Sequence, residues 1–192
     1  MSDELQGKRI AIIATDGVEQ IELEKPREAA RQAGASVELL SLGTDPIQAM
    51  NSDIEPADRF DPDGRVADAD PGDYDGLILP GGTVNADRLR MDDDVRAFVR
   101  STFAAGTPVA VICHGPWTLV SADLVRGRTL TSFPSLRIDI RNAGGNPVDE
   151  EVVVDNGLVS SRDPDDLPAF CAKLVEELAE GEHAEQRRSV TA

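Results

Sequence analysis

Residues 108–117 have the sequence PVAVICHGPW. A short apolar run ends at Cys113, and then His114, a glycine and a proline precede a helical pattern that begins near Trp117. This order predicts a buried strand that turns sharply into a helix, with a thiol at the corner. Such a corner exposes a nucleophile, and the partial positive charge of a helix N-terminus favours its thiolate form. We therefore predict that Cys113 is the nucleophile of an enzyme; the plainer interpretation is a small buried hydrophobic residue.

The segments on either side alternate between apolar runs and helical patterns. Further strands are predicted at residues 8–14, 36–41, 76–80, 128–132, 151–155 and 157–161. Helices are predicted at residues 18–33, 94–105, 117–125, 134–143 and 165–179. Residues 45–75 are rich in Pro, Gly and Asp, which predicts short edge strands and loops. The alternation indicates a single α/β domain over residues 1–192, an open sandwich around a largely parallel sheet, with frayed tails at 1–6 and 181–192.

The composition limits the location and the partners. The 192-residue chain has a formal net charge of −17, with 40% hydrophobic and 4% aromatic residues. The excess of acids argues against nucleic-acid binding, which depends on basic side chains that neutralise phosphates. No apolar run approaches the roughly 20 residues that span a bilayer, and the acidic start does not resemble a secretory signal. We expect a cytoplasmic protein that does not bind membranes, and the even spread of acids suggests a halophilic source, because salt screens their repulsion.

The two cysteines and two histidines narrow the chemistry further. In a cytoplasmic protein they predict no structural disulfide, and no metal site, because no close ligand spacing joins them. Cys171 falls among apolar residues of the last predicted helix and is expected to pack in the core. His183 lies in the predicted C-terminal tail, so the one candidate base for Cys113 is His114. Otherwise the site has no ordinary base, and His114 is an exposed or supporting residue.

Polar residues and glycines follow three of the predicted strands. Glu19 and Glu22 follow the first, Gly81-Gly82 follows the strand at 76–80, and His114 lies beyond the cysteine strand. Ligands bind at the carboxyl ends of parallel strands, so these groups are expected to converge. A protonated carboxyl beside a thiol donates a hydrogen bond to the thiolate, and the N–H of one of the two glycines, together with that of His114, can bind a developing oxyanion. The plainer alternatives are solvated carboxylates at a helix start and an ordinary Gly-Gly turn.

Four segments together resemble the ThiJ/PfpI superfamily, and within it the PfpI-type intracellular peptidases and general stress proteins. They are DGVEQIE at 16–22, LPGG at 79–82, ICHGP at 112–116 and LTS at 130–132. The resemblance implies a flavodoxin-like three-layer sandwich with a nucleophile elbow at Cys113, and makes His114 the catalytic partner. It also implies that Glu22 is the carboxyl beside the thiol, with Glu19 in support, and that the Gly82 and His114 amides form the oxyanion hole.

The resemblance also places a third acid. In PfpI-type members this acid comes from a neighbouring subunit, in the loop after Gly-Gly and just before an Arg-x-Arg stretch. The matching residue here is Asp87, which precedes Arg88-Leu89-Arg90. The loop at 83–87 is slightly longer than is typical, and the acid is Asp in place of Glu. The resemblance therefore implies a homo-oligomer, a dimer or a hexamer, with Asp87 near a subunit interface.

Three functions are compatible with a reactive Cys113. The resemblance implies a stress-response hydrolase that acts on reactive carbonyl or glycation adducts, as glyoxalases and deglycases do, with proton transfer by His114 and Glu22 and no cofactor. An intracellular cysteine peptidase would use the same Cys-His site for acyl transfer on a peptide substrate, so the motif does not separate the two. A redox sensor or chaperone-like protein would instead oxidise Cys113 without turnover.

Overall fold

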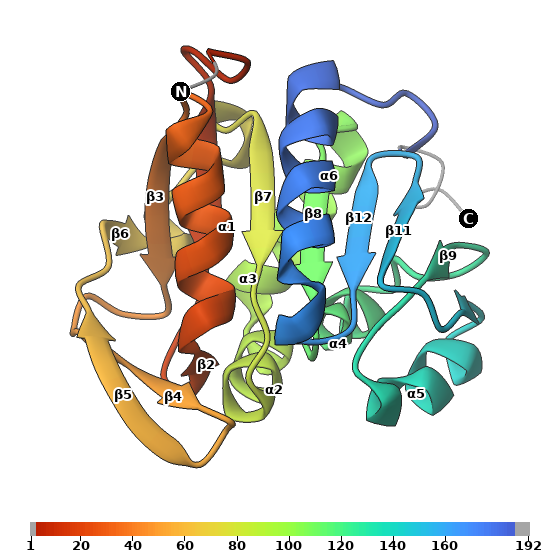
Figure 1. Cartoon of the computed structure of the whole chain (residues 1–192), viewed down its shortest axis with the longest axis horizontal. Coiled ribbons are helices and arrows are strands. Elements are labelled where there is room, and N and C mark those ends of the chain that lie inside the picture. The colour runs from red at the N-terminus through yellow and green to blue at the C-terminus, as the bar shows by residue number, and fades with distance from the viewer. Residues whose placement is uncertain (1–2, 187–192) are drawn as a thin grey trace.

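The central sheet is built from the apolar runs that were predicted to be strands. The computed structural model describes residues 3–186, and within them seven strands form one sheet. Their order across the sheet (Figure 1) is β11 (Val152–Asp155), β12 (Leu158–Ser161), β8 (Val109–Ile112), β7 (Gly76–Leu79), β1 (Arg9–Ile13), β3 (Ser36–Ser41) and β6 (Gly64–Arg65). The pairings are parallel except for the hairpin β11–β12. The carboxyl ends of the parallel strands therefore meet along one edge.

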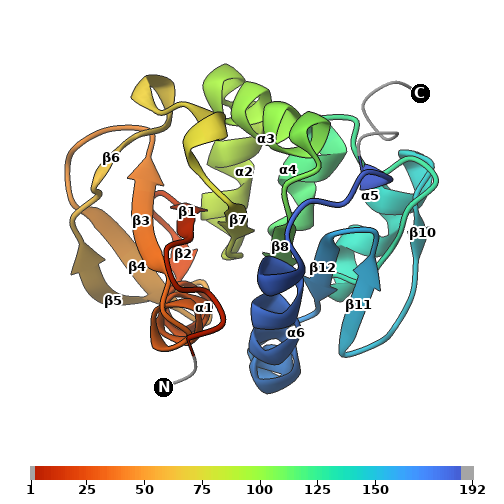
Figure 2. The ribbon, with the colours of Figure 1, turned by 90° about the horizontal axis from the view of Figure 1, so that it is seen from above.

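Helices cover both faces of this sheet and make three layers (Figure 2). One face carries α1 (Gln20–Gln32) and α6 (Leu167–Glu180), and the other carries α2 (Thr83–Met91), α3 (Asp93–Ala105) and α4 (Pro116–Ser121). Successive residues of a strand point to opposite faces. Ile10 and Ile12 of β1 join the apolar cluster under α1 and α6, and Ala11 and Ile13 join the cluster under α3. The predicted flavodoxin-like α/β sandwich is confirmed.

Short elements surround the main sheet. Residues 45–75, which were predicted to form short edge strands and loops, contain a β-hairpin. Its strands β4 (Ile47–Asn51) and β5 (Glu55–Phe60) join β2 (Val18–Glu19) in a small sheet. On the other side β9 (Thr129–Leu130) pairs with β10 (Asn146–Pro147), next to α5 (Arg137–Asn142). Single 3₁₀ turns complete the chain at Val66–Asp68, Pro71–Asp73, Pro134–Leu136 and Pro164–Asp166.

Several helix boundaries differ from the sequence prediction. The helix expected at 18–33 begins at Gln20, because Val18–Glu19 pairs with β4. The helix expected at 117–125 ends at Ser121. The segment at 83–87, interpreted as a loop, is the start of α2, in which Asn85 and Ala86 are buried. These differences arise from contacts between segments that are distant in the sequence, which the pattern of apolar residues within one segment does not reveal.

The expected frayed tails are ordered where the structure describes them. Leu5 is fully buried, and its N–H donates to the Ala33 carbonyl at 2.8 Å. Gln186 is also fully buried, and its side-chain amide donates to the Thr107 carbonyl at 2.9 Å. The prediction is therefore wrong for residues 3–6 and 181–186, whereas 1–2 and 187–192 lie outside the described residues. Within 3–186, none of the helices combines the length and apolar character needed to cross a bilayer.

Candidate active site

Cys113 lies at the sharp turn between β8 and α4. Its φ of +59° is in the left-handed region, which is strained for a residue with a side chain and costs of order 1–3 kcal/mol. Neighbouring backbone holds this geometry: the Cys113 N–H donates to the Ser161 carbonyl at 3.1 Å, and the Phe133 N–H donates to the Cys113 carbonyl at 2.9 Å. The predicted corner is present. However, Cys113 is only 6% exposed, so its thiol is not directed at bulk solvent as the sequence suggested.

The Gly81-Gly82 pair lets the backbone approach the thiol closely. A Cβ on Gly81 would lie 2.5 Å from Glu22 Oε2 and 2.7 Å from the Cys113 Cβ. Gly82 has a φ of +86°, a conformation that glycine adopts without strain. The Gly82 and His114 N–H groups both donate toward the Cys113 side chain. The two amides named as an oxyanion hole therefore lie beside the reacting sulfur.

Glu22 is fully buried in the first turn of α1 and lies against the Cys113 thiol. Its Oε2 accepts a hydrogen bond from the Gly81 N–H at 2.8 Å, and its Oε1 accepts none. Burial raises the pKa of Glu22 to about 8, against the lowering effect of the Gly81 N–H and the thiol. The carboxyl is therefore protonated at neutral pH and is a hydrogen-bond donor.

The thiol and the carboxyl are electrostatically linked. Burial raises the pKa of Cys113, an ionised Glu22 raises it further, and the Gly82 and His114 N–H groups lower it. While Glu22 holds its proton, its charge is absent and it stabilises a forming thiolate by hydrogen bonding. The partial positive charge at the N-terminus of α4, which was predicted from the sequence to favour the thiolate, is small because α4 has only six residues. Reaction at Cys113 therefore needs a base to take the thiol proton.

His114 is placed to be that base. Its Nδ1 lies 3.2 Å from Cys113 Sγ, and its ring stacks on Phe133 with the ring centroids 4.6 Å apart. Burial lowers the pKa of His114, so the imidazole is neutral at pH 7 and can accept a proton. On the far side of the ring, Nε2 lies 3.4 Å from Thr83 Oγ1 and 3.5 Å from Ser135 Oγ.

A second carboxylate supports the histidine through Thr83. Asp53, in the turn between β4 and β5, accepts hydrogen bonds from the Thr83 N–H at 2.7 Å and from the Thr83 hydroxyl at 2.9 Å. The Thr83 oxygen is then free to accept from Nε2–H of His114, which leaves Nδ1 as the acceptor facing the thiol. Glu19 accepts from the N–H groups of Ser52 and Asp53 at 3.1 and 3.2 Å. Glu19 thus fixes the turn that carries Asp53 and does not contact the thiol.

These features coincide with a known family. The family model described as DJ-1/PfpI matches residues 8–177. The chain belongs to the DJ-1/PfpI family. Uncharacterized proteins of Staphylococcus haemolyticus and Staphylococcus saprophyticus are 40% and 41% identical to it over 175 residues, which is 89% of this chain and 98% of each relative. Membership confirms the ThiJ/PfpI resemblance and supports a stress-related protein of the DJ-1 kind.

Solved DJ-1/PfpI structures share the fold. Drosophila melanogaster DJ-1beta is 29% identical with a TM-score of 0.81, and the match covers 100% of this chain and 96% of the fly chain. An Anabaena variabilis protein with DJ-1/ThiJ/PfpI-like and ferritin-like domains is 32% identical with a TM-score of 0.84. That match covers 89% of this chain and 48% of the Anabaena chain, so the likeness concerns one of its two domains.

The structure divides the residues predicted for this DJ-1/PfpI site into two groups. Cys113, His114, Glu22 and Gly82 converge, whereas Glu19 acts on the hairpin turn. Asp87 lies exposed on α2 and takes no part in these hydrogen bonds within one chain, so its role across an interface stays a prediction.

Asp53, Thr83 and Ser135 were not predicted from the sequence. Weak signals point to the first two of them. Thr83 directly follows the Gly81-Gly82 pair, and Asp53 lies in a turn-forming Asn-Ser-Asp segment of the irregular region. Neither signal identifies a partner for His114, because Asp53 arrives only with the folded β4–β5 hairpin and Thr83 only with the start of α2.

Proposed function

We propose that this DJ-1/PfpI protein is a cytoplasmic cysteine-dependent hydrolase that acts on small reactive carbonyl compounds or their glycation adducts, without a cofactor. The observation that carries the proposal is the Glu22 carboxyl, which is fully buried against the Cys113 thiol and whose pKa is raised by burial to about 8. His114 adds a neutral base on the same sulfur. A proton acceptor and a proton donor around one thiol suit reactions that move protons between carbon and oxygen.

For a 2-oxoaldehyde, the proposed reaction begins when His114 Nδ1 accepts the thiol proton and the Cys113 sulfur adds to the aldehyde carbon. A C–S bond forms, the C=O π bond breaks, and the oxygen takes the Glu22 proton to give a hemithioacetal. The Gly82 and His114 N–H groups favour the negative charge that develops beside them. The Glu22 carboxylate then removes the proton from the former aldehyde carbon.

The His114 imidazolium gives its proton to the neighbouring ketone oxygen, which leaves an enediol. Glu22 returns its proton to the carbon that carries that oxygen and takes the proton of the other hydroxyl, whose oxygen becomes the C=O of a thioester. Water hydrolyses the thioester, which releases a 2-hydroxy acid and restores the thiol. The overall change is addition of one water to the 2-oxoaldehyde, so no external oxidant or reductant is needed. The site residues return to their starting protonation states.

Crowding around the sulfur favours this function over the alternatives. Glu22, Gly81 and His114 enclose the thiol, which leaves room for a small carbonyl more readily than for a peptide backbone. The peptidase alternative is supported by the Cys113–His114 pair, whose 3.2 Å separation also suits acyl transfer. Burial disfavours the redox-sensor alternative, because oxidation of a thiol requires thiolate character and exposure.

We also propose that the protein forms a homo-oligomer in which Asp87 approaches His114 of the partner subunit. The support for this is an exposed apolar surface on the same helix as Asp87: Val84 and Met91 are 46% and 67% exposed. Exposed apolar residues of this size mark interaction surfaces more often when they lie together.

One panel of substrates separates these functions. The wild type, Cys113→Ala and the matched control Cys171→Ala are offered methylglyoxal, a glycated thiol and a denatured protein, in molar salt. Carbonyl turnover that is lost in Cys113→Ala and kept in Cys171→Ala is the expected result. Cleavage of the denatured protein with the same dependence on Cys113 would favour the peptidase, and no turnover of any substrate would overturn the proposal.

A further inference from the structure

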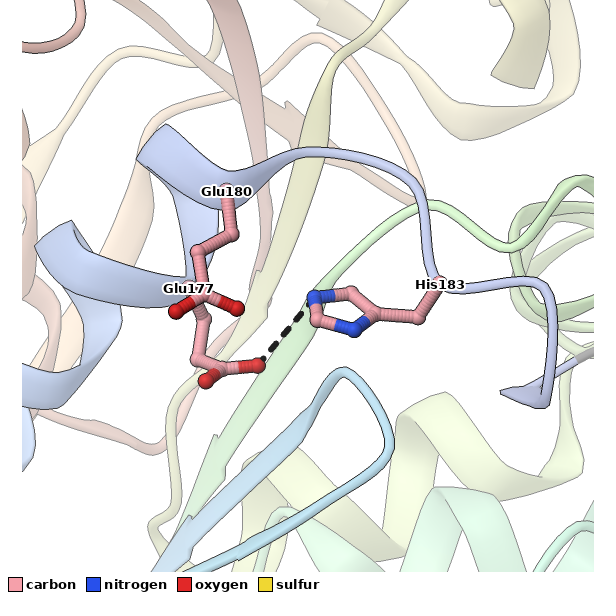
Figure 3. A group of neighbouring side chains, drawn as sticks. All are labelled: Glu177, Glu180 and His183. Atoms are coloured by element: carbon pink, nitrogen blue, oxygen red, sulfur yellow. Dashed lines mark ion pairs between the residues drawn. The ribbon is translucent and has the colours of Figure 1, made fainter.

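The second histidine of the chain belongs to a cluster far from Cys113. Glu177 and Glu180 lie in the last turn of α6, three residues apart, and therefore share a face of the helix. The chain turns at Gly181, whose φ is +86°, and brings the His183 ring back toward the two carboxylates (Figure 3). One ligand atom from each of the three residues lies within 4.8 Å of the other two. Within residues 3–186 no other such group of three is found.

The contact between Glu177 and His183 is not an ordinary hydrogen bond. Glu177 Oε2 lies 3.2 Å from His183 Nε2, but both atoms are buried and neither has a hydrogen-bond partner. Glu177 is only 6% exposed. Lys173, which lies one helical turn before Glu177, forms an ion pair with Glu176. A buried carboxyl oxygen and an imidazole nitrogen thus face each other at ion-pair distance, and neither has a hydrogen-bond partner among the described residues.

That spacing fits two ligands of one cation. Zinc binds imidazole nitrogen and carboxylate oxygen at about 2.0–2.2 Å, which puts two ligands about 3.0–3.4 Å apart for angles between octahedral and tetrahedral. The C-terminal end of α6 adds partial negative charge from its last carbonyl groups. A carboxylate oxygen of the exposed Glu180 lies within 4.8 Å of both of these atoms, near enough to be a third ligand of the same cation.

His183 is held in place by the backbone at the start of two strands. Its N–H donates to the Gly106 carbonyl at 2.8 Å. Its ring packs on Gly157, where an added Cβ would lie 2.8 Å from the ring carbon Cδ2. The side chain of Gln186 ties the same segment to the Thr107 carbonyl. The ring is therefore oriented before any ligand binds, which favours binding because little ordering remains to be done.

We propose that Glu177, Glu180 and His183 form a binding site for a divalent transition-metal cation, with Zn²⁺ the best fit, that fastens residues 181–186 to the C-terminal end of α6. One imidazole with two carboxylates suits zinc better than Mg²⁺ or Ca²⁺, which prefer oxygen ligands alone. The expectation of no metal site rested on cysteine and histidine spacing and did not weigh carboxylates. The site is independent of the reaction proposed at Cys113.

The test is Zn²⁺ titration by calorimetry in a Cys113→Ser/Cys171→Ser background, which removes competing thiols. His183→Gln and Glu180→Gln each remove one ligand. Glu176→Gln is the matched control, because it removes an exposed carboxylate from the same turn of α6. Hydrogen exchange at the amides of residues 183–186 reports whether zinc fastens the segment, and Mg²⁺ serves as the competing cation.

We expect one Zn²⁺ per chain, an affinity reduced by about tenfold or more in His183→Gln and Glu180→Gln, and no change in Glu176→Gln. We also expect zinc to slow exchange at residues 183–186. Absence of zinc binding would overturn the proposal and leave a bare Glu177–His183 ion pair. Equal affinity in all three variants would also overturn it, because it would indicate diffuse binding to the acidic surface.

Discussion

Replacing Glu22 by Gln removes an ionisable group from a site that favours its neutral form. Gln has nearly the same shape, its side-chain oxygen can accept the Gly81 N–H, and it cannot ionise. Burial raises the pKa of Glu22 from 4.5 to about 8. Between these pH values the unfolded chain releases this proton while the folded chain keeps it, so the wild type loses stability as the pH rises. Glu22→Gln does not have this loss.

The size of the effect follows from the pKa. Each unit corresponds to about 1.4 kcal/mol, so the loss in the wild type is about 3 kcal/mol at pH 7 and approaches about 5 kcal/mol above pH 8. We therefore expect the free energy of unfolding of Glu22→Gln to exceed that of the wild type by an amount that grows with pH over this range.

Urea unfolding at several pH values between about 4.5 and 8.5, at constant ionic strength, measures this difference. Glu28→Gln is the matched control, because it removes one charge from the exposed side of the same helix, where Glu28 pairs with Lys25. A difference between wild type and Glu22→Gln that stays constant across the pH range would refute the reasoning. It would mean that Glu22 is ionised in the folded protein at neutral pH.

Three further predictions concern the site and the surface. Asp53→Asn should lower kcat by about tenfold or more with little change in KM, because it weakens support for His114 without touching the substrate; steady-state kinetics beside Asp58→Asn, an exposed change in the same hairpin, measure this. Asp87→Ala should lower activity without unfolding the subunit, and unchanged activity would mean that the site is complete in one chain. The thermal midpoint should rise in molar salt, because 36 acidic residues face only 19 basic ones; equal midpoints in dilute buffer and molar salt would contradict a halophilic origin.

The corner at Cys113 was predictable because its signal is local. A continuous apolar run, a cysteine and then Gly-Pro define a strand, a turn and a helix start within ten residues of sequence, and the structure has that order. Glu22 lies against the thiol in the structure, and the family resemblance, not its local sequence, had named it for that place. Its burial, which raises its pKa, depends on contacts with Gly81 and Cys113 and could not be derived from its own segment.

The support for His114 could not be predicted, because it depends on how distant segments meet. Asp53 reaches the site only when the β4–β5 hairpin folds beside β2, and Thr83 does so only because α2 starts directly after Gly82. Residues 83–87 were interpreted as a loop from the family resemblance, whereas they form the start of α2. The burial of Leu5 and Gln186 has the same origin, since each fills a space made by other elements.

The pH dependence of kcat/KM for methylglyoxal, in the wild type and Glu22→Gln, tests the central claim that a protonated Glu22 assists reaction at Cys113. We expect the wild-type value to fall as the pH rises through about 8, where Glu22 ionises, raises the pKa of the thiol and can no longer donate a proton. Glu22→Gln can neither give nor take the proton, so its kcat/KM should be much lower than the wild-type value and should lack this fall. A wild-type value that keeps rising above pH 8, a profile shared by both proteins, or no turnover at any pH would contradict the account.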